Sequence, residues 1–516
     1  MRPHPRATAL SAALAFAGTA TAAPLFLEPR TGNLAACLRR QGVTPVTPNS
    51  ANYSADVAAY NQRIQPEPAS ILYPASPEQI ATALTCAARN NVSVSARGGG
   101  HSYASYGLGG TDGALVVDLG EFRQIVVDED GLAKVGAGNR LGDIYLALDQ
   151  QGWAMAAGTC PGVGIGGHAG FGGFGLPSRM WGLASDQVVG YDLVLANGTI
   201  LTNLTRSSDA DLFWGLNGAA PNFGIVTSYY IQAHHAPANA VIFSYTYTDP
   251  STTIAATAFH SYEQYANLSA PANLGIGATI GAGSLEISGV WYGPEAEFGA
   301  VIQPLKDELP PSVDESVNSF TWIESAQQLA GNQDLNTMGQ GLLSRDTFYA
   351  KSLMTPSTIP LDIEVIEKFF DYLWTTNTST KWFVETHPYG GANSAINDVS
   401  LNESSFGHRD KLLVFQLYAS SSTYGLPYDS DGISFVKGMF DTLVDGMTSA
   451  SPAWSNDSTS ADGYAAYVNY VDPELTPAEV KNLYWGSQYD RLAQLKAEYD
   501  PQWVLRNPQG IEPASA

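Results

Sequence analysis

Three consecutive glycines and a histidine stand in the stretch Ser95-Ala96-Arg97-Gly98-Gly99-Gly100-His101-Ser102-Tyr103, which continues the segment VSVSA. The alternation in VSVSA predicts a β-strand. Glycines at the end of a strand let backbone N–H groups approach a phosphate with no Cβ in the way, so a pyrophosphate would fit here. From this stretch alone, a glycine-rich turn with a surface histidine is an equally good interpretation.

A second glycine-rich segment runs from Gly158 to Gly175 and contains Cys160. Its spacing Gly162-x-Gly164-x-x-Gly167 matches the dinucleotide fingerprint, with Asp186 about 20 residues further on. The fingerprint requires a helix that begins at its last glycines. Because GGHAGFGGFG is too rich in glycine to propagate a helix, and Pro161 interrupts the approach from the preceding strand, we expect no nicotinamide site of the Rossmann type.

Two kinds of pattern divide the rest of the chain. From residue 74 to about 236, short Val- and Ile-rich strands alternate with glycine-rich turns and helix-like stretches such as SPEQIATALTCAARN, where Ser76 and Glu78 suit a helix start. Past His235, strands of alternating polarity and long helical stretches predict an antiparallel sheet with helices on one face. A polar loop covers about 449–463. We therefore expect an α+β protein of two domains, since 516 residues exceed one ordinary core.

The N-terminus has the order of a secretory signal peptide. The basic MRPHPR precedes an Ala-rich apolar run that ends in Ala20-Thr21-Ala22, and this run is too short for a membrane span. We expect a signal peptide over 1–22 and a secreted, extracellular protein. Asn-x-Ser/Thr sequons suit a glycoprotein; they occur at Asn52, Asn91, Asn197, Asn203, Asn267, Asn377, Asn402 and Asn456.

The chain has three cysteines, and in an oxidising compartment an odd number leaves one without an intramolecular partner. Cys37 and Cys86 lie in helix-like contexts near the N-terminus, where a disulfide is expected to tie the N-terminal arm down. Cys160 is the one left over.

A net charge of −24 argues against nucleic acid or an anionic membrane as a partner. We further expect a monomer and no metal site.

Taken together, the motifs resemble the fungal branch of the berberine-bridge-enzyme-like flavoprotein oxidases, particularly the glucooligosaccharide oxidases. The resemblance covers nearly the whole mature chain, and its motifs are ARGGGHSYASYG, GTCPGVGIGGHAGFGGFG, DLFWGLNGAAPNFGIVT, YVNYVDPEL and YWGSQYDRLAQLKAEYDP. It implies a vanillyl-alcohol-oxidase-type fold, in which both chain ends build an FAD-binding domain. We expect 23–236 and 463–516 to form that domain and 237–462 to form the substrate domain.

The resemblance also implies that FAD is bound covalently through His101 and Cys160, which would explain the odd cysteine count. Residues expected to line the cofactor are Arg97, Gly98, Gly99, Gly100, Ser102, Gly164, Gly166, Gly167, His168, Asn222, Gly224 and Ile225.

For catalysis, Tyr470 matches the family's general base. A tyrosine with a pKa of about 10 needs a partner that stabilises its phenolate. The family's aspartate for this task falls on His387 in the stretch WFVETHPYGG. Strand alternation places Glu385 and His387 on one face, so a Glu385–His387–Tyr470 relay is possible, although a satisfied structural histidine is the alternative. Tyr103 is expected to contact substrate or to pack in the core.

The implied activity is that of a carbohydrate oxidase, which converts the anomeric hydroxyl to a lactone and passes electrons to oxygen. Val163 matches a position that leaves room for oxygen. The substrate alternative is a polyol, an alkaloid or another secondary-metabolite alcohol, because His387 departs from the family pattern. A non-catalytic sugar-binding glycoprotein is the alternative from a different class. A glycosidase has less support, since no carboxylate pair stands out.

Overall fold

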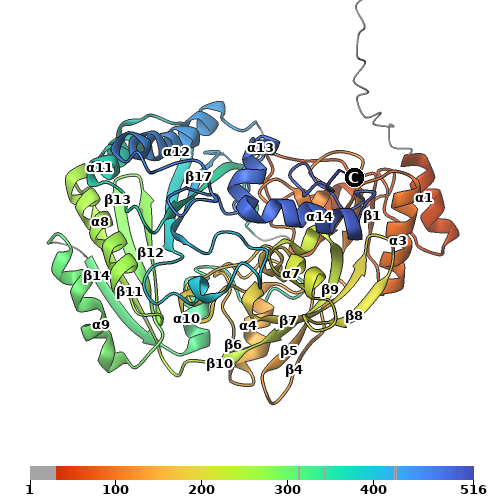
Figure 1. Cartoon of the computed structure of the whole chain (residues 1–516), viewed down its shortest axis with the longest axis horizontal. Coiled ribbons are helices and arrows are strands. Elements are labelled where there is room, and N and C mark those ends of the chain that lie inside the picture. Colours follow the sequence, from red (N-terminus) through yellow and green to blue (C-terminus); the bar gives the residue numbers. More distant parts are fainter. Residues whose placement is uncertain (1–30, 312–313, 342–343, 424, 426, 516) are drawn as a thin grey trace, which may run out of the picture.

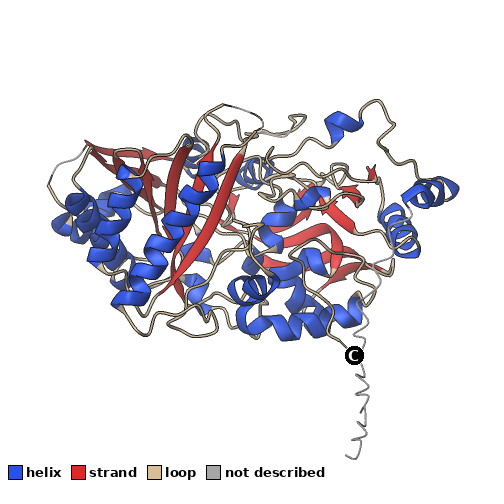
Figure 2. Cartoon of the chain, turned by 90° about the horizontal axis from the view of Figure 1, so that it is seen from above, coloured by secondary structure: helices blue, strands red, loops and turns tan. Residues whose placement is uncertain are grey.

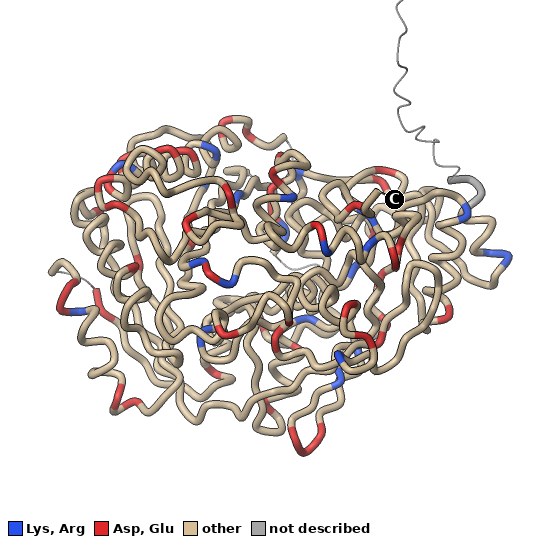
Figure 3. Tube along the Cα trace, in the orientation of Figure 1, with Lys and Arg blue, Asp and Glu red and all other residues tan. Residues whose placement is uncertain are grey.

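The structure is a computed structural model that describes residues 31–311, 314–341, 344–423, 425 and 427–515. The expected signal peptide over 1–22 lies outside the described residues. No helix within the described ranges is long and apolar enough to cross a membrane. Acidic residues are spread along the chain over both halves of the molecule, and basic residues are sparser (Figure 3).

The first half of the chain forms two small sheets. A parallel sheet has the strand order β1-β3-β2, and an antiparallel sheet has the order β4-β5-β9-β7-β8. The strands are β1 (Ser70–Leu72), β2 (Val94–Arg97), β3 (Leu115–Asp118), β4 (Ile125–Val127), β5 (Leu132–Gly136), β7 (Val188–Leu195), β8 (Ile200–Leu204) and β9 (Gly224–Gln232). The short strands β6 (Trp153–Ala154) and β10 (His234–His235) pair separately. The short Val- and Ile-rich strands predicted between residue 74 and about 236 are thus confirmed, and VSVSA contains the start of β2.

Helices and short turns connect these strands. The helices are α1 (Thr31–Arg40), α2 (Tyr53–Asp56), α3 (Pro77–Arg89), α4 (Leu141–Asp149), α5 (Ile165–Gly170), α6 (Ser178–Trp181) and α7 (Ala210–Ala219), with single turns η1 (Tyr106–Leu108), η2 (Ser185–Gln187) and η3 (Ala220–Asn222). The predicted helix over SPEQIATALTCAARN is α3, with Ser76 at its N-cap. Its buried face, which includes Cys86, packs on α1, and the expected Cys37–Cys86 disulfide is confirmed.

The second half is dominated by a seven-stranded antiparallel sheet in the order β14-β11-β13-β12-β16-β17-β15. Its strands are β11 (Ala240–Thr248), β12 (Leu274–Gly281), β13 (Ser284–Trp291), β14 (Asp314–Phe320), β15 (Phe348–Pro356), β16 (Lys381–Pro388) and β17 (Lys411–Ser420). Helices α8 (Thr252–Leu268), α9 (Glu295–Glu308), α11 (Ile363–Thr375) and α12 (Ser430–Ala450) lie on its outer side (Figures 1 and 2). The expected sheet with helices on one face is therefore confirmed.

The C-terminal elements return to the first half. They are α13 (Pro477–Val480), η5 (Lys481–Trp485), η6 (Gly486–Gln488) and α14 (Tyr489–Tyr499); α10 (Trp322–Leu329) and η4 (Ala395–Asp398) complete the fold. Helix α14 contacts α7, and Figure 1 shows it in blue among the N-terminal elements. The hydrophobic core of the first half contains Leu492, Val504 and Ile511. One core is thus built from both chain ends, as the fold class predicted.

A buried ion pair holds this returning segment. Lys496 and Asp500 lie 2.7 Å apart with at most 1% of either side chain exposed. The Lys496 ammonium also donates to the carbonyls of Asn222 and Leu505, while Asp500 accepts the N–H groups of Val504 and Leu505. These bonds satisfy both buried charges, and they tie α14 to the loop that carries Asn222.

One expectation about the second glycine-rich segment was wrong. The helix α5 does form over IGGHAG, with Gly164 at its N-cap. Tertiary packing overrides the low helix propensity of glycine, because Ile165 and Ala169 are buried in the core. The dinucleotide fingerprint still lacks its parallel strand, since β6, which precedes it, pairs antiparallel with β10.

Candidate active site

A cavity of about 660 Å³ lies between the two glycine-rich loops, the C-terminal segment and the inner face of the seven-stranded sheet. Most of the expected site residues line it: Arg97, Gly98, Gly99, Gly100, His101, Ser102, Tyr103, Cys160, Val163, Gly164, Gly166, Gly167, His168, Asn222, Gly224, Glu385, His387 and Tyr470. Ile225 is buried in the hydrophobic core and does not line the cavity.

The two glycine-rich loops touch each other through their backbones. A Cβ on Gly99 would lie 2.3 Å from the nitrogen of Gly164, and a Cβ on Gly164 would lie 2.2 Å from the nitrogen of Gly99. Only glycine allows this approach. A Cβ on Gly167 would meet no atom within 4 Å, so its backbone faces open space. The loops therefore form a concave surface whose backbone amides are accessible to a ligand.

His101 and Cys160 face the same cavity from these two loops. The imidazole stacks on Tyr60, with ring centroids 4.3 Å apart, and its buried Nε2 has no hydrogen-bond partner among the residues that the structure describes. Burial, helped by the charge of Arg140, lowers the pKa of His101 to about 3, so the ring is neutral. The Cys160 thiol opens onto the cavity but is screened from bulk water; burial and the charge of Glu385 raise its pKa to about 11. Both groups are thus uncharged.

Three other residues that were expected to line the cofactor make hydrogen bonds within the protein. Arg97 binds the carboxylate of Asp118 and the carbonyl of Asp56, so its guanidinium is occupied. His168 accepts the N–H of Gly158 at 3.1 Å, which shapes the loop around Cys160. The Asn222 side chain accepts the N–H of Ile511 at 3.1 Å.

Tyr470 lines the same cavity and comes from the C-terminal segment. Its ring stacks on Tyr103, with centroids 5.9 Å apart and an interplanar angle of 10°, and meets Phe174 and Tyr467 edge-on. Burial raises the pKa of Tyr470 well above its usual value, and the negative charge of Glu385 adds to this. In the protein alone Tyr470 is therefore a protonated phenol.

Strand β16 places Glu385 and His387 on the cavity side, as the alternation predicted, while Thr386 points under the helices and bonds Tyr262. Burial lowers the pKa of His387 to about 4, so this imidazole is also neutral. It meets Phe174 edge-on, with centroids 5.8 Å apart. Among the described residues no hydrogen bond joins Glu385, His387 and Tyr470, and the relay stays a prediction.

Gln416 was missed by the sequence reasoning. It lies directly opposite Glu385 in the β16–β17 ladder and donates to the Tyr103 hydroxyl at 2.6 Å. Every residue of β17 is buried. A polar side chain inside the apolar run KLLVFQLYAS was the available signal, because a buried amide needs a partner.

Asp472 anchors the segment that carries Tyr470. Its carboxylate accepts the Tyr349 hydroxyl at 2.9 Å and pairs with Lys351 at 2.7 Å, both on β15. Its backbone N–H donates to the Tyr484 hydroxyl. Asp472, two residues after the candidate base Tyr470, therefore anchors this segment to the seven-stranded sheet.

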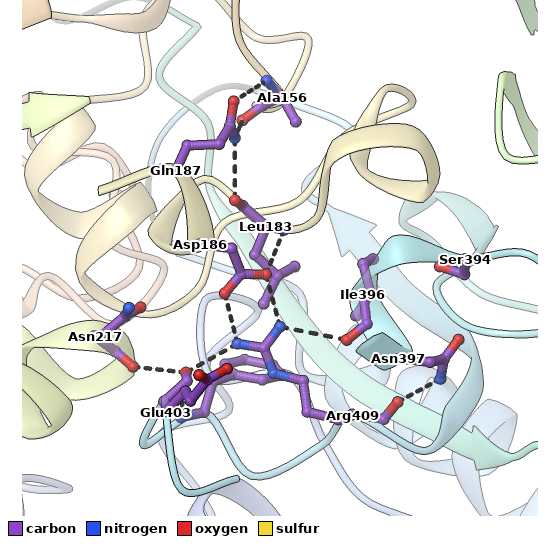
Figure 4. Close-up of polar contacts among 12 residues, drawn as sticks. Ala156, Leu183, Asp186, Gln187, Asn217, Ser394, Ile396, Asn397, Glu403 and Arg409 are labelled. Carbon is purple, nitrogen blue, oxygen red and sulfur yellow. Dashed lines mark hydrogen bonds and ion pairs between the residues drawn. The ribbon is translucent and has the colours of Figure 1, made fainter. Parts of the chain in front are cut away.

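Asp186 has no free oxygen for a ribose. Its two oxygens each accept from the Arg409 guanidinium at 2.7 Å, and one also accepts the N–H of Leu183 (Figure 4). Arg409 further donates to Ser404, which bonds the Asn217 carbonyl. The pair joins η2, shortly after the second glycine-rich loop, to the loop before β17.

Comparisons with known proteins agree with this geometry. Residues 68–203 match the FAD binding domain family, and residues 466–512 match the family described as berberine and berberine like. The carbohydrate oxidase of Microdochium nivale is 35% identical over 93% of this chain and 95% of its own length. The chain belongs to the berberine-bridge-enzyme-like family of FAD-linked oxidases.

Other members of this family match along nearly their whole length. The xylooligosaccharide oxidase of Thermothelomyces thermophilus is 34% identical over 93% of this chain and 94% of its own. The structure of a glucooligosaccharide oxidase from Acremonium strictum, described with a 6-S-cysteinyl, 8α-N1-histidyl FAD, superposes with a TM-score of 0.86 at 31% identity. It covers 94% of this chain and 100% of that one. The expected vanillyl-alcohol-oxidase-type fold is thereby confirmed.

Proposed function

We propose that the protein is an FAD-dependent carbohydrate oxidase, which oxidises the anomeric hydroxyl of a mono- or oligosaccharide to a lactone and reduces oxygen to hydrogen peroxide. The observation that carries the proposal is the shared cavity. It is lined by His101 and Cys160 from the two glycine-rich loops and by Tyr470 from the C-terminal segment.

The residues present fit a doubly attached flavin. His101 has a buried, unpartnered ring nitrogen, Cys160 is a free thiol, and the glycine backbones leave a surface that a Cβ would fill. His101 and Cys160 would hold the flavin, as in the related enzyme described with cysteinyl and histidyl FAD. When bound, FAD supplies the hydride acceptor.

Tyr470 would take the proton of the anomeric hydroxyl at its phenolic oxygen. Because burial keeps Tyr470 a protonated phenol, the phenol's own proton must pass to a neighbouring acceptor as the proton of the sugar hydroxyl arrives. The neutral His387, which lines the same cavity, is the candidate, with Glu385 next to it. The sheet and the Asp472 anchor keep these groups in place.

The sugar would lie against aromatic side chains. Phe383 stacks on Tyr418 at 4.6 Å, and both line the cavity together with Trp382 and Tyr60. Aromatic faces cover the apolar face of a pyranose well. A polyol or a secondary-metabolite alcohol could use the same surface, and a substrate panel separates these classes.

Secretion is part of the proposal. The Cys37–Cys86 disulfide suits an oxidising compartment. The sequon asparagines are exposed except Asn267, which is half-buried, and the others are therefore accessible to a glycan.

The test is to purify the mature protein and measure peroxide release with a panel of sugars, polyols and aromatic alcohols. We expect yellow protein that oxidises reducing sugars. Peroxide from the other alcohols alone would contradict the sugar assignment, and colourless protein without turnover would favour a non-catalytic sugar-binding protein.

A further inference from the structure

Glu385 presents a carboxylate to the cavity where the proposed chemistry takes place. Its charge acts on both the Cys160 thiol and the Tyr470 phenol, raising the pKa of each. The carboxylate therefore lies close to a residue that would hold the flavin and to the candidate base. A substrate group that contacts Glu385 therefore lies in the cavity that Cys160 and Tyr470 also line.

This carboxylate has no cationic partner within the described part of the chain. No ion pair or hydrogen bond of its side chain is formed, and its pKa is raised by burial alone. The Arg97 guanidinium is occupied by Asp118. Lys381 is exposed at the start of β16, roughly 13 Å away at strand spacing. Glu385 is half-buried, and a carboxylate that is partly withdrawn from water without a partner is stabilised when a ligand supplies one.

The surroundings of Glu385 suit a positively charged group on a substrate. The rings of Tyr103, Tyr470 and Phe174 line the same cavity, and aromatic faces attract cations. The amide of Gln416 lies opposite on β17. In a sugar oxidised at its anomeric carbon, the neighbouring substituent is the one on carbon 2.

We propose that the preferred substrates are 2-amino sugars, in which the reducing-end residue carries a free ammonium group beside the anomeric carbon, and that Glu385 recognises this group. The proposal rests on the carbohydrate oxidase function and narrows its substrate class. A hydroxyl or an acetylated amine at the same carbon offers no charge to Glu385.

The experiment compares three disaccharides that share one linkage and differ at carbon 2: the glucosamine dimer, cellobiose and diacetylchitobiose. We expect kcat/KM for the glucosamine dimer to exceed that for cellobiose by about 10-fold or more. Glu385→Gln should lower kcat/KM for the glucosamine dimer by roughly 10- to 100-fold more than it lowers kcat/KM for cellobiose, so that the preference for the amino sugar is lost.

Glu286→Gln is the matched control. Glu286 lies on the same sheet, because Thr279 pairs with Glu286 on one side and with Glu385 on the other, but it is outside the cavity. The control should leave all three rates unchanged. Equal rates for the amino and neutral dimers, or an equal loss on all three in Glu385→Gln, would overturn the proposal.

Binding gives a readout that is independent of turnover. The 1,5-anhydro forms of glucosamine and glucose lack the anomeric hydroxyl, so calorimetry on the flavin-loaded protein measures affinity alone. The amino form should bind more tightly, and Glu385→Gln should remove the difference. Equal affinities would overturn the amino-sugar proposal, whereas selective binding with no oxidation of any sugar would count against the oxidase function only.

Discussion

The cavity has two walls that are built differently. The flavin wall consists of residues 97–102 and 158–168, two short loops that meet through glycine backbones and carry His101 and Cys160. The sugar wall consists of Tyr103, Tyr470 and the inner faces of β16 and β17, where side chains from distant segments stand on a rigid sheet. The difference indicates that separate residues attach the cofactor and select the substrate. Substitutions can therefore remove one function without the other.

The largest effect should follow from removing both attachment residues of the flavin wall. His101→Ala combined with Cys160→Ser should release the flavin on acid precipitation and abolish peroxide formation, because no covalent bond remains. Each single variant should keep an acid-stable yellow colour through the other residue. The absorbance of the precipitate measures this. Flavin lost from the unmodified protein in acid would show that the attachment is not covalent.

On the sugar wall, Tyr470→Phe removes the proton acceptor and keeps the ring. Anaerobic stopped-flow reduction of the flavin by substrate should slow by about 10²–10⁴-fold, the usual contribution of a general base, with little change in substrate affinity. Tyr464→Phe, which alters a ring stacked on Trp454 outside the cavity, is the control. An unchanged rate in Tyr470→Phe would place the base elsewhere, and Glu385 would be tested next.

The ion pair that joins η2 to the loop before β17 can be broken at Arg409. Arg409→Met leaves the Asp186 carboxylate buried and unpaired, and it should lower the free energy of unfolding by about 3–5 kcal/mol in urea titrations. Adding Asp186→Leu should recover much of this loss, since the uncompensated charge is removed. If the double variant is as unstable as the single one, the hydrogen bonds of Arg409 to Ser404 matter more than the charge.

The smallest effect is expected at His387. His387→Ala should slow flavin reduction by roughly 10-fold, below the range for the base itself. In the proposed relay His387 stabilises the Tyr470 phenolate, so its loss raises the pKa of Tyr470, and the increase of the rate with pH should move to higher pH. The pH profile of the reduction rate measures both. A profile that keeps its position while the rate falls would indicate that His387 supports packing against Phe174 only.

Most of the fold could be predicted from the sequence. The β-strands and α3 follow from residue periodicity, and the disulfide follows from the position of two cysteines in helix-like segments. The helix α5 was missed because its stability comes from burying Ile165 and Ala169, which propensity does not include. The domain bounds at 236 and 462 stay predictions.

For the site, the sequence located the two glycine-rich loops, because the residues of each loop are nearly consecutive, and the family resemblance singled out His101 and Cys160. That the loops meet at Gly99 and Gly164 was decided by the tertiary structure. The sequence also determined that Glu385 and His387 share a face, since strand alternation has a period of two. Only the tertiary structure decided that Gln416 lies opposite Glu385, that Arg409 pairs with Asp186, and that none of the described residues forms an ion pair with Glu385. Strand register and burial depend on contacts between residues far apart in the chain, and no local pattern records them.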